Sequence, residues 1–310
     1  MTAAASAQGP AGRAAAARFL DPRVLARIGN LDLVARTVID GFVSGQHRAT
    51  FRGISTDFAE HRAYVPGDDV RFVDWRVYAR TDRLYVRTFE AETNADLVLA
   101  LDVSRSMDFG AKGLAKLDYA RFLLASLAHL AGRQRDKVGL VAFDSGLVDV
   151  VPPSVRHRDE VLRHLERLRP GGPGDLAAAM RRVGDGLHRR GIVVVVSDFY
   201  VAPEDAASAL DGLRVRGHDV IALQVLDPVE IDLELDGAEV LEDLETGERL
   251  PVSPQALAGE YRRLVEDHGE ALRARLGERR VDFSRFDTAA PLDHALFAYL
   301  AGRARLARVR

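Results

Sequence analysis

Three oxygen-bearing side chains alternate at the end of a strand-like apolar run: Asp102, Ser104 and Ser106. A buried strand that ends in such a loop brings one carboxylate and two hydroxyls to the carboxyl edge of a sheet, where open α/β sheets bind ligands. A second apolar run, 192–196, leads to Asp198 two residues later. If the two strands are neighbours, Asp102 and Asp198 face each other across a crevice at that edge.

Carboxylates and hydroxyls without histidine or cysteine form a hard-oxygen ligand set, which suits Mg²⁺ or Mn²⁺ with several waters retained. The sequence therefore predicts a divalent-cation site made of Asp102, Ser104, Ser106 and Asp198. The plainer alternative is that the aspartate and serines only cap the next helix, as these residue types often do. The chain contains no cysteine, which excludes thiolate metal sites, disulfides and cysteine nucleophiles.

Strand-like and helix-like segments alternate around these residues. Apolar runs at 97–101, 138–143, 192–196 and 220–225 are separated by segments whose apolar residues recur at helical spacing. Such alternation predicts a mostly parallel sheet with helices on both faces, joined by right-handed crossovers. We therefore expect a doubly wound α/β fold that places the polar strand ends together.

The chain is predicted to divide into three parts. These are an Ala-rich disordered tail over 1–18, a segment with a helix and β-rich structure over 19–95, and the α/β domain over 96–310. The middle part contains a helical pattern at Leu31–Val43 and strand-like clusters at Val70–Trp75 and Leu84–Phe89. A β-hairpin is expected as an insertion near 228–252, and a helix over 292–307 closes the domain.

The spacing Asp102-x-Ser104-x-Ser106 at a strand end resembles the metal-ion-dependent adhesion site of von Willebrand factor A-type domains. The resemblance implies a von Willebrand factor A-like fold in which a threonine from a second loop and an aspartate from a third complete the site. Asp198 matches the third loop. It also implies that one metal position stays open for an acidic group of a partner protein.

The second loop departs from that pattern. Gly174 stands where the resemblance expects the threonine, within the run 171–176, and no threonine occurs between Thr93 and Thr246. A water molecule or Asp175 could replace the missing ligand, and metal affinity is expected to be reduced or lost.

Residue runs before the predicted sheet make the resemblance more specific, because they point to one bacterial family. The runs Gly53–Phe58 and Tyr64–Trp75, then Ala79-Arg80 and Phe89-Glu90, together with the serine loop, resemble the bacterial family catalogued as domain of unknown function fifty-eight. This resemblance covers roughly residues 30 to 300. It implies a partner ATPase of the MoxR-type AAA+ class and a role in the assembly or maturation of a client protein.

A charged cluster in the same region has two interpretations. Turn chemistry and buried arginine–carboxylate pairs would explain it structurally, and a partner-binding surface is the alternative. Its members are Asp68, Asp69, Arg71, Asp74, Trp75 and Arg80. The only tryptophan, Trp75, is interpreted as a core or domain-contact residue.

Charge and hydropathy exclude two further classes of function. The 310 residues carry a net charge of -3, and the pI is near 6.3, so nothing drives general binding to nucleic acid. No apolar run approaches the ~20 residues of a transmembrane helix. The N-terminus lacks the features of a secretory signal peptide, and a cytoplasmic location is therefore expected.

Three functional hypotheses follow. The first is a non-enzymatic adaptor that binds an acidic partner group through Mg²⁺. The second is a Mg²⁺-dependent phosphatase or hydrolase of the haloacid-dehalogenase type, although Ser104 stands where those enzymes need a second aspartate and no lysine follows Lys137. The third is a scaffold whose metal site is degenerate, which Gly174 suggests.

Overall fold

The structure is a computed structural model. It describes residues 25, 30–44, 60–63, 75–88, 96–111, 113–133, 135–235, 240–251 and 254–292. The predicted tail over 1–18, the cluster members Asp68, Asp69, Arg71 and Asp74, and the closing helix beyond residue 292 lie outside these ranges.

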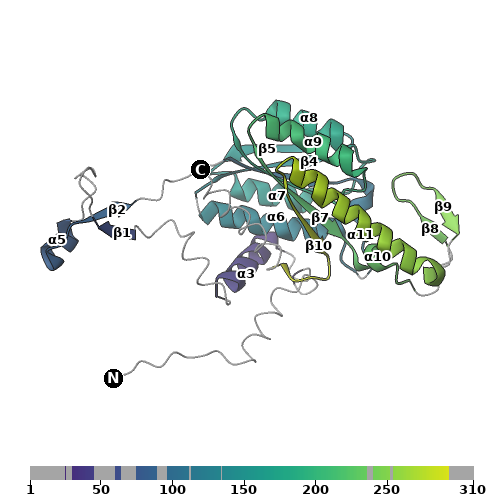
Figure 1. Ribbon diagram of the computed structural model, residues 1–310, viewed down its shortest axis with the longest axis horizontal. Coiled ribbons are helices and arrows are strands. Elements are labelled where there is room, and N and C mark those ends of the chain that lie inside the picture. The colour runs from purple at the N-terminus through teal and green to yellow at the C-terminus, as the bar shows by residue number, and fades with distance from the viewer. Residues whose placement is uncertain are drawn as a thin grey trace, which may run out of the picture.

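A six-stranded sheet forms the centre of the molecule (Figure 1). Its spatial order is β10-β7-β6-β3-β4-β5, and only β5 runs antiparallel to its neighbour. The strands are β3 (Asp96–Asp102), β4 (Lys137–Phe143), β5 (Leu147–Ser154), β6 (Gly191–Ser197), β7 (Asp219–Leu226) and β10 (Asp282–Asp287). The predicted α/β fold class is confirmed.

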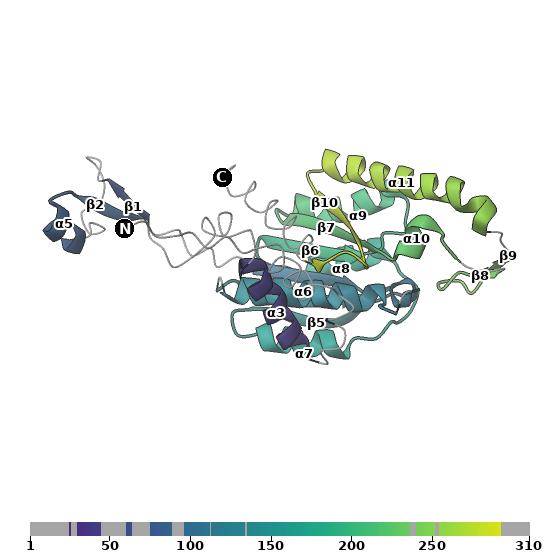
Figure 2. The same cartoon turned by 90° about the horizontal axis from the view of Figure 1, so that it is seen from below.

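Helices lie above and below the sheet in Figure 1 and so cover both of its faces, and Figure 2 views the same arrangement from below. One face is covered by α3 (Leu31–Ser44), α6 (Lys116–Arg133) and α7 (Arg158–Arg167), the other by α8 (Leu176–Gly186), α9 (Pro203–Val215) and α11 (Pro254–Glu278). Within β3, Leu97, Leu99 and Leu101 join the first core, whereas Val98 and Ala100 join the second. The continuous apolar run of β3 thus reflects burial on both faces, which is typical of a central parallel strand.

A small two-stranded sheet forms in the N-terminal part. β1 (Glu60–Ala63) pairs antiparallel with β2 (Tyr85–Thr88), and the short helix α5 (Trp75–Thr81) lies between them in the chain. One expectation was wrong here: Trp75 begins a helix instead of ending a strand. Of the two roles expected for Trp75, the core role is excluded, because the residue is 59% exposed. The indole instead contacts the ring of Tyr78, three residues further along α5, edge to face.

A hairpin stands between α10 (Pro228–Asp232) and α11. Its strands are β8 (Val240–Glu242) and β9 (Arg249–Pro251), which pair antiparallel within the range where the sequence predicts a hairpin. The following helix α11 buries Leu272 and Leu276 near its end, whereas Leu257 and Leu264 near the hairpin are exposed. None of the helices in the described ranges is both long and apolar enough to span a bilayer.

Candidate functional site

The carboxyl edge of the sheet is lined with aspartates. One aspartate ends or directly follows each of the parallel strands: Asp102 on β3, Asp144 after β4, Asp198 after β6, Asp227 after β7 and Asp287 on β10. Asp144 and Asp227 accept hydrogen bonds from backbone amides of nearby loops and have a structural role. Because β3 and β6 are paired neighbours, Asp102 and Asp198 lie at the middle of the edge, as the sequence predicts.

Asp102, Ser104 and Ser106 come together after β3. Oδ1 of Asp102 accepts a hydrogen bond from the amide of Ser104 at 2.9 Å, and its Oδ2 accepts one from the Ser197 hydroxyl at 2.7 Å. The hydroxyl oxygens of Ser104 and Ser106 lie 3.2 Å apart. Burial of Asp102 and the nearby negative charge of Asp198 raise the pKa of the Asp102 carboxyl to about 6.

Asp198 is held by a lysine that sequence reasoning missed. The ammonium of Lys116, the first residue of α6, lies 2.8 Å from Oδ2 of Asp198 and 2.6 Å from Oε1 of Glu230 on α10. The Lys116 side chain is fully buried and its ammonium lies 5.0 Å from the centre of the Tyr200 ring. Burial alone would lower the pKa of Lys116, but the charges of Asp198 and Glu230 outweigh it and raise that pKa.

One feature of the sequence marks Lys116 as unusual. It stands four residues before Ala120 on the apolar, buried face of α6, and a lysine on an apolar helix face is seldom buried without a partner. That anomaly pointed to a buried carboxylate, although not to which one.

The second loop lies beside the serines. A β-carbon added to Gly174 would be 3.3 Å from Cβ and 3.5 Å from Oγ of Ser104. Gly174 therefore occupies a place from which a threonine hydroxyl would reach the site. Asp175, the suggested substitute, caps α8 by accepting a hydrogen bond from the amide of Ala178 at 2.8 Å.

A carboxylate from the hairpin also enters the site. Oε1 of Glu245 accepts a hydrogen bond from the amide of Ser106 at 2.9 Å, and Oε2 accepts one from the amide of Gly174 at 3.2 Å. Nothing in the sequence singled out Glu245, which is 139 residues from Ser106 along the chain. Its side chain bridges the first and second loops of the site.

The donor chemistry and the charge balance both fit a hard divalent cation. Asp102, Ser104 and Ser106 offer only oxygen ligands, the type that Mg²⁺ and Mn²⁺ prefer. The ammonium of Lys116 is paired with two carboxylates, those of Asp198 and Glu230, and the buried carboxyl of Asp102 lies near Asp198, so negative charge is in excess. Across the described ranges, no three histidine, cysteine, aspartate or glutamate side chains converge as metal ligands. Hydroxyls and water would therefore supply much of the coordination.

Replacing Gly174 with threonine is expected to tighten Mg²⁺ binding roughly tenfold. The new hydroxyl would add an oxygen ligand beside Ser104, and the backbone of Gly174 does not have the positive φ that only glycine adopts easily. Titration calorimetry with MgCl₂ measures the change. Gly174→Val is the matched control, because valine has the same shape without the hydroxyl. Equal affinities of the two variants would show that position 174 does not contact the ion.

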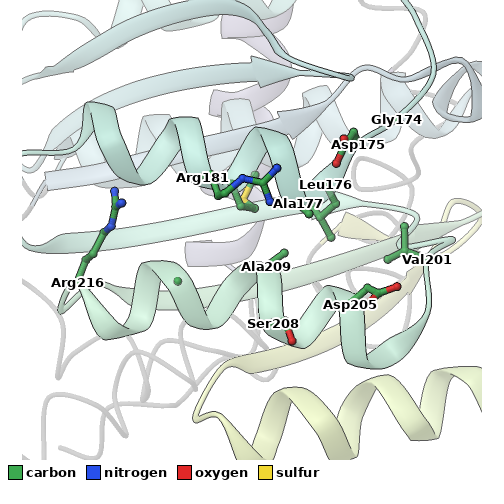
Figure 3. Close-up of a pocket in the computed structure, with 12 residues that line it drawn as sticks. Gly174, Asp175, Leu176, Ala177, Arg181, Val201, Asp205, Ser208, Ala209 and Arg216 are labelled. Carbon is green, nitrogen blue, oxygen red and sulfur yellow. The ribbon is translucent and has the colours of Figure 1, made fainter.

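A hollow of about 530 Å³ opens next to the site, between α8 and α9. Figure 3 shows Gly174, Asp175 and Val201 at one end of it and Arg216 at the other, with Arg181 between them on α8. Its lining combines apolar side chains with these charged groups. The hollow could accommodate residues that flank a group bound at the sheet edge.

Comparison with known proteins places these features in a family context. A family model described as "Protein of unknown function DUF58" matches residues 60–271. Two relatives named only as uncharacterized proteins, one from Mycobacterium bovis and one from Mycobacterium tuberculosis, are each 32% identical over 256 residues. Each alignment covers 80% of this chain and 80% of the relative.

Two solved structures align at lower identity. The conserved hypothetical protein BatB from Bacteroides thetaiotaomicron is 17% identical, with a TM-score of 0.49, over 69% of this chain and 99% of that one. An aerotolerance-related membrane protein from Bacteroides fragilis is 18% identical, with a TM-score of 0.48, over 67% of this chain and 98% of that one. These likenesses are too distant to bear on function.

Proposed function

The chain belongs to the DUF58 family, whose function is unknown, and we propose that it is a non-enzymatic protein-binding adaptor. In this proposal Mg²⁺ or Mn²⁺ at the carboxyl edge of the sheet bridges the chain to an acidic side chain of a partner. The observation that carries the proposal is the pair of hydroxyls of Ser104 and Ser106, 3.2 Å apart, beside the buried carboxyl of Asp102.

Each residue of the site has a distinct part in this binding mode. The hydroxyls of Ser104 and Ser106 would hold the metal, and Asp102 would supply negative charge and orient bound water. Asp198 would add negative charge near the metal without binding it directly, because its Oδ2 is already paired with Lys116. The bound ion would contribute a positive charge that attracts a carboxylate. Amide groups of Ser106 and Gly174 would orient that carboxylate, as they do for Glu245.

The partners that fit this proposal are an AAA+ ATPase of the MoxR type and a client protein. The ATPase would supply the energy for assembly or maturation of the client, and this chain would supply recognition. We place this activity in the cytoplasm. The hollow between α8 and α9 opens beside Gly174, so residues next to the acidic group of the partner would contact its lining.

The second candidate is a Mg²⁺-dependent phosphatase of the haloacid-dehalogenase type. The observation in its favour is the buried Lys116–Asp198 pair, which gives the site the lysine that such chemistry requires. Against it, Ser104 stands where the acid/base aspartate is needed. Turnover of generic phosphoesters that is abolished by Asp102→Asn would establish this enzyme and overturn the adaptor proposal.

Mg²⁺ is expected to stabilise the wild-type protein and not the Ser104→Ala variant. At about 100 times its dissociation constant, a ligand specific to the folded state adds roughly 2.7 kcal/mol, which corresponds to several degrees in the unfolding midpoint. Differential scanning calorimetry in EDTA and in MgCl₂ measures the shift. Binding of the MoxR-type ATPase should show the same dependence on Mg²⁺ and on Ser104.

The matched control is Ser208→Ala on the exposed side of α9. This variant should retain the full Mg²⁺ shift, because the lost hydroxyl is not at the sheet edge. A wild-type midpoint that is the same in EDTA and in MgCl₂ contradicts the proposed metal bridge.

A further inference from the structure

Within the described residues, the side chain of Glu245 joins the hairpin to the sheet loops by hydrogen bonds. Both hydrogen bonds that link 240–251 to the sheet loops, within the described parts of the chain, are accepted by Glu245. They come from the amide of Ser106 in the first loop and the amide of Gly174 in the second. The carboxylate therefore lies in a cradle of two amide donors, next to the serine hydroxyls.

The turn that carries Glu245 is ordered by its own hydrogen bonds. Oδ1 of Asp243 accepts hydrogen bonds from the amides of Glu245 and Thr246 at 2.7 and 3.0 Å. The hydroxyl of Thr246 accepts one from the amide of Glu248 at 3.2 Å, and Gly247 takes a positive φ of 74°. These hydrogen bonds lie within the turn and orient the residue that carries the carboxylate.

Glu245 is less exposed than its neighbours in the turn. Residues 242–244 and 246–251 are exposed, whereas Glu245 is half-buried at the site. A turn that served only to connect α10 and α11 would have no need to direct one charged side chain onto two amides of distant loops. The arrangement has the form of a ligand attached to its own binding site.

We propose that Glu245 is an internal competitor that occupies the carboxylate position of the site until an acidic partner displaces it. This inference rests on the proposed function, because it concerns the regulation of the same site. A tethered group reaches effective concentrations in the millimolar range. If the hairpin occupies the site for about nine-tenths of the time, the apparent affinity for a free carboxylate falls about tenfold.

The charges and hydrogen-bond donors at the site make Glu245 and a partner carboxylate compete. Glu245 brings negative charge to an edge that already carries the buried carboxyls of Asp102 and Asp198. A carboxylate from a partner cannot share the two amides with Glu245, because each amide has one proton to donate. Binding of the partner and release of the hairpin are therefore coupled.

Sodium acetate is a suitable probe for this competition. The amide resonances of Ser106 and Gly174 are followed by NMR while acetate is added to wild type and to Glu245→Ala, in MgCl₂ and separately in EDTA, with sodium chloride as the ionic-strength control. Glu245→Ala is expected to respond to acetate at a concentration at least tenfold lower than wild type. Glu248→Ala is the matched control, since this glutamate lies on the same turn with an exposed side chain, and it should behave as wild type.

The possible outcomes separate this inference from the proposed function. Identical responses of wild type, Glu245→Ala and Glu248→Ala would overturn the internal competition. A tenfold gain for Glu245→Ala that is the same in EDTA and in MgCl₂ would support the competition and reject the metal bridge. A gain that requires MgCl₂ supports both.

Discussion

Lys116→Met is expected to lower the free energy of unfolding by about 3–5 kcal/mol. The ammonium of Lys116 is fully buried and is the positive charge that faces both Asp198 and Glu230, at 2.8 and 2.6 Å. Methionine fills a similar volume but leaves two carboxylates in a poorly hydrated place without a counter-ion. Urea unfolding at neutral pH, followed by circular dichroism, measures the loss.

The chain offers a matched control and a rescue for this variant. Lys137 pairs with Asp96 at 3.5 Å with 28% of its side chain exposed, so Lys137→Met should cost less than about 1 kcal/mol. Adding Asp198→Asn and Glu230→Gln to Lys116→Met should restore most of the stability, since neither side chain that faced Lys116 is then charged. A loss for Lys116→Met no larger than that for Lys137→Met would mean that the buried network is not ionised.

Asp102→Asn is expected to make the metal-free protein more stable at pH 8, by up to about 3 kcal/mol. The pKa of Asp102 rises from 3.8 to about 6 in the folded protein, and each pKa unit corresponds to about 1.4 kcal/mol. Asparagine keeps the acceptor for the amide of Ser104 and can donate to the hydroxyl of Ser197, so both hydrogen bonds of the site have a replacement.

The sign of the pH dependence is fixed by the raised pKa. Well below pH 3.8, Asp102 is protonated in the folded and unfolded states, and the variant has no advantage. As the pH rises towards 6, the unfolded chain ionises while the folded protein retains its proton, and wild-type stability falls. The advantage of Asp102→Asn should therefore grow between pH 4 and pH 7 and then level off.

Chemical denaturation across this pH range, in EDTA and in MgCl₂, tests the expectation. Mg²⁺ should reduce the advantage of Asp102→Asn, because a bound cation stabilises the ionised wild-type carboxylate. Asp144→Asn is the control. Asp144 accepts hydrogen bonds from the amides of Gly146 and Gly172, so removal of its charge should not raise the free energy of unfolding. An Asp102→Asn variant that is less stable than wild type at pH 8 in EDTA would show that the ionised Asp102 carboxylate does not destabilise the metal-free protein.

The parts of the site that lie on adjacent elements could be predicted from the sequence. Asp102 and Asp198 each follow an apolar run, and parallel strands deliver their ends to one edge, so hydrophobic pattern and topology bring them together. The serine spacing likewise lies within one loop. The apolar runs and the serine spacing are local signals. They lead to the site once the alternation of strands and helices is recognised.

The charged partners of the site could not be predicted in the same way. Lys116 is 82 residues from Asp198 and 114 from Glu230, and Glu245 is 139 from Ser106. No periodicity connects residues at such separations, and their pairing depends on how α10 and the hairpin pack over the sheet edge. Trp75 differs for another reason: of the core and domain-contact roles expected from its size, the core role is excluded because Trp75 is exposed on the short helix α5.

The uneven burial of α11 has a consequence for how the site can open. Leu272 and Leu276 anchor its second half in the core, whereas Leu257 and Leu264 in the first half face solvent. Helical segments of about 12–15 residues are marginally stable in water on their own. Amides in the first half of α11 and in the hairpin should therefore exchange with solvent through small local openings, while those of β3 exchange only on global unfolding. Local opening of the hairpin would release Glu245 from the amides of Ser106 and Gly174 without unfolding of the sheet.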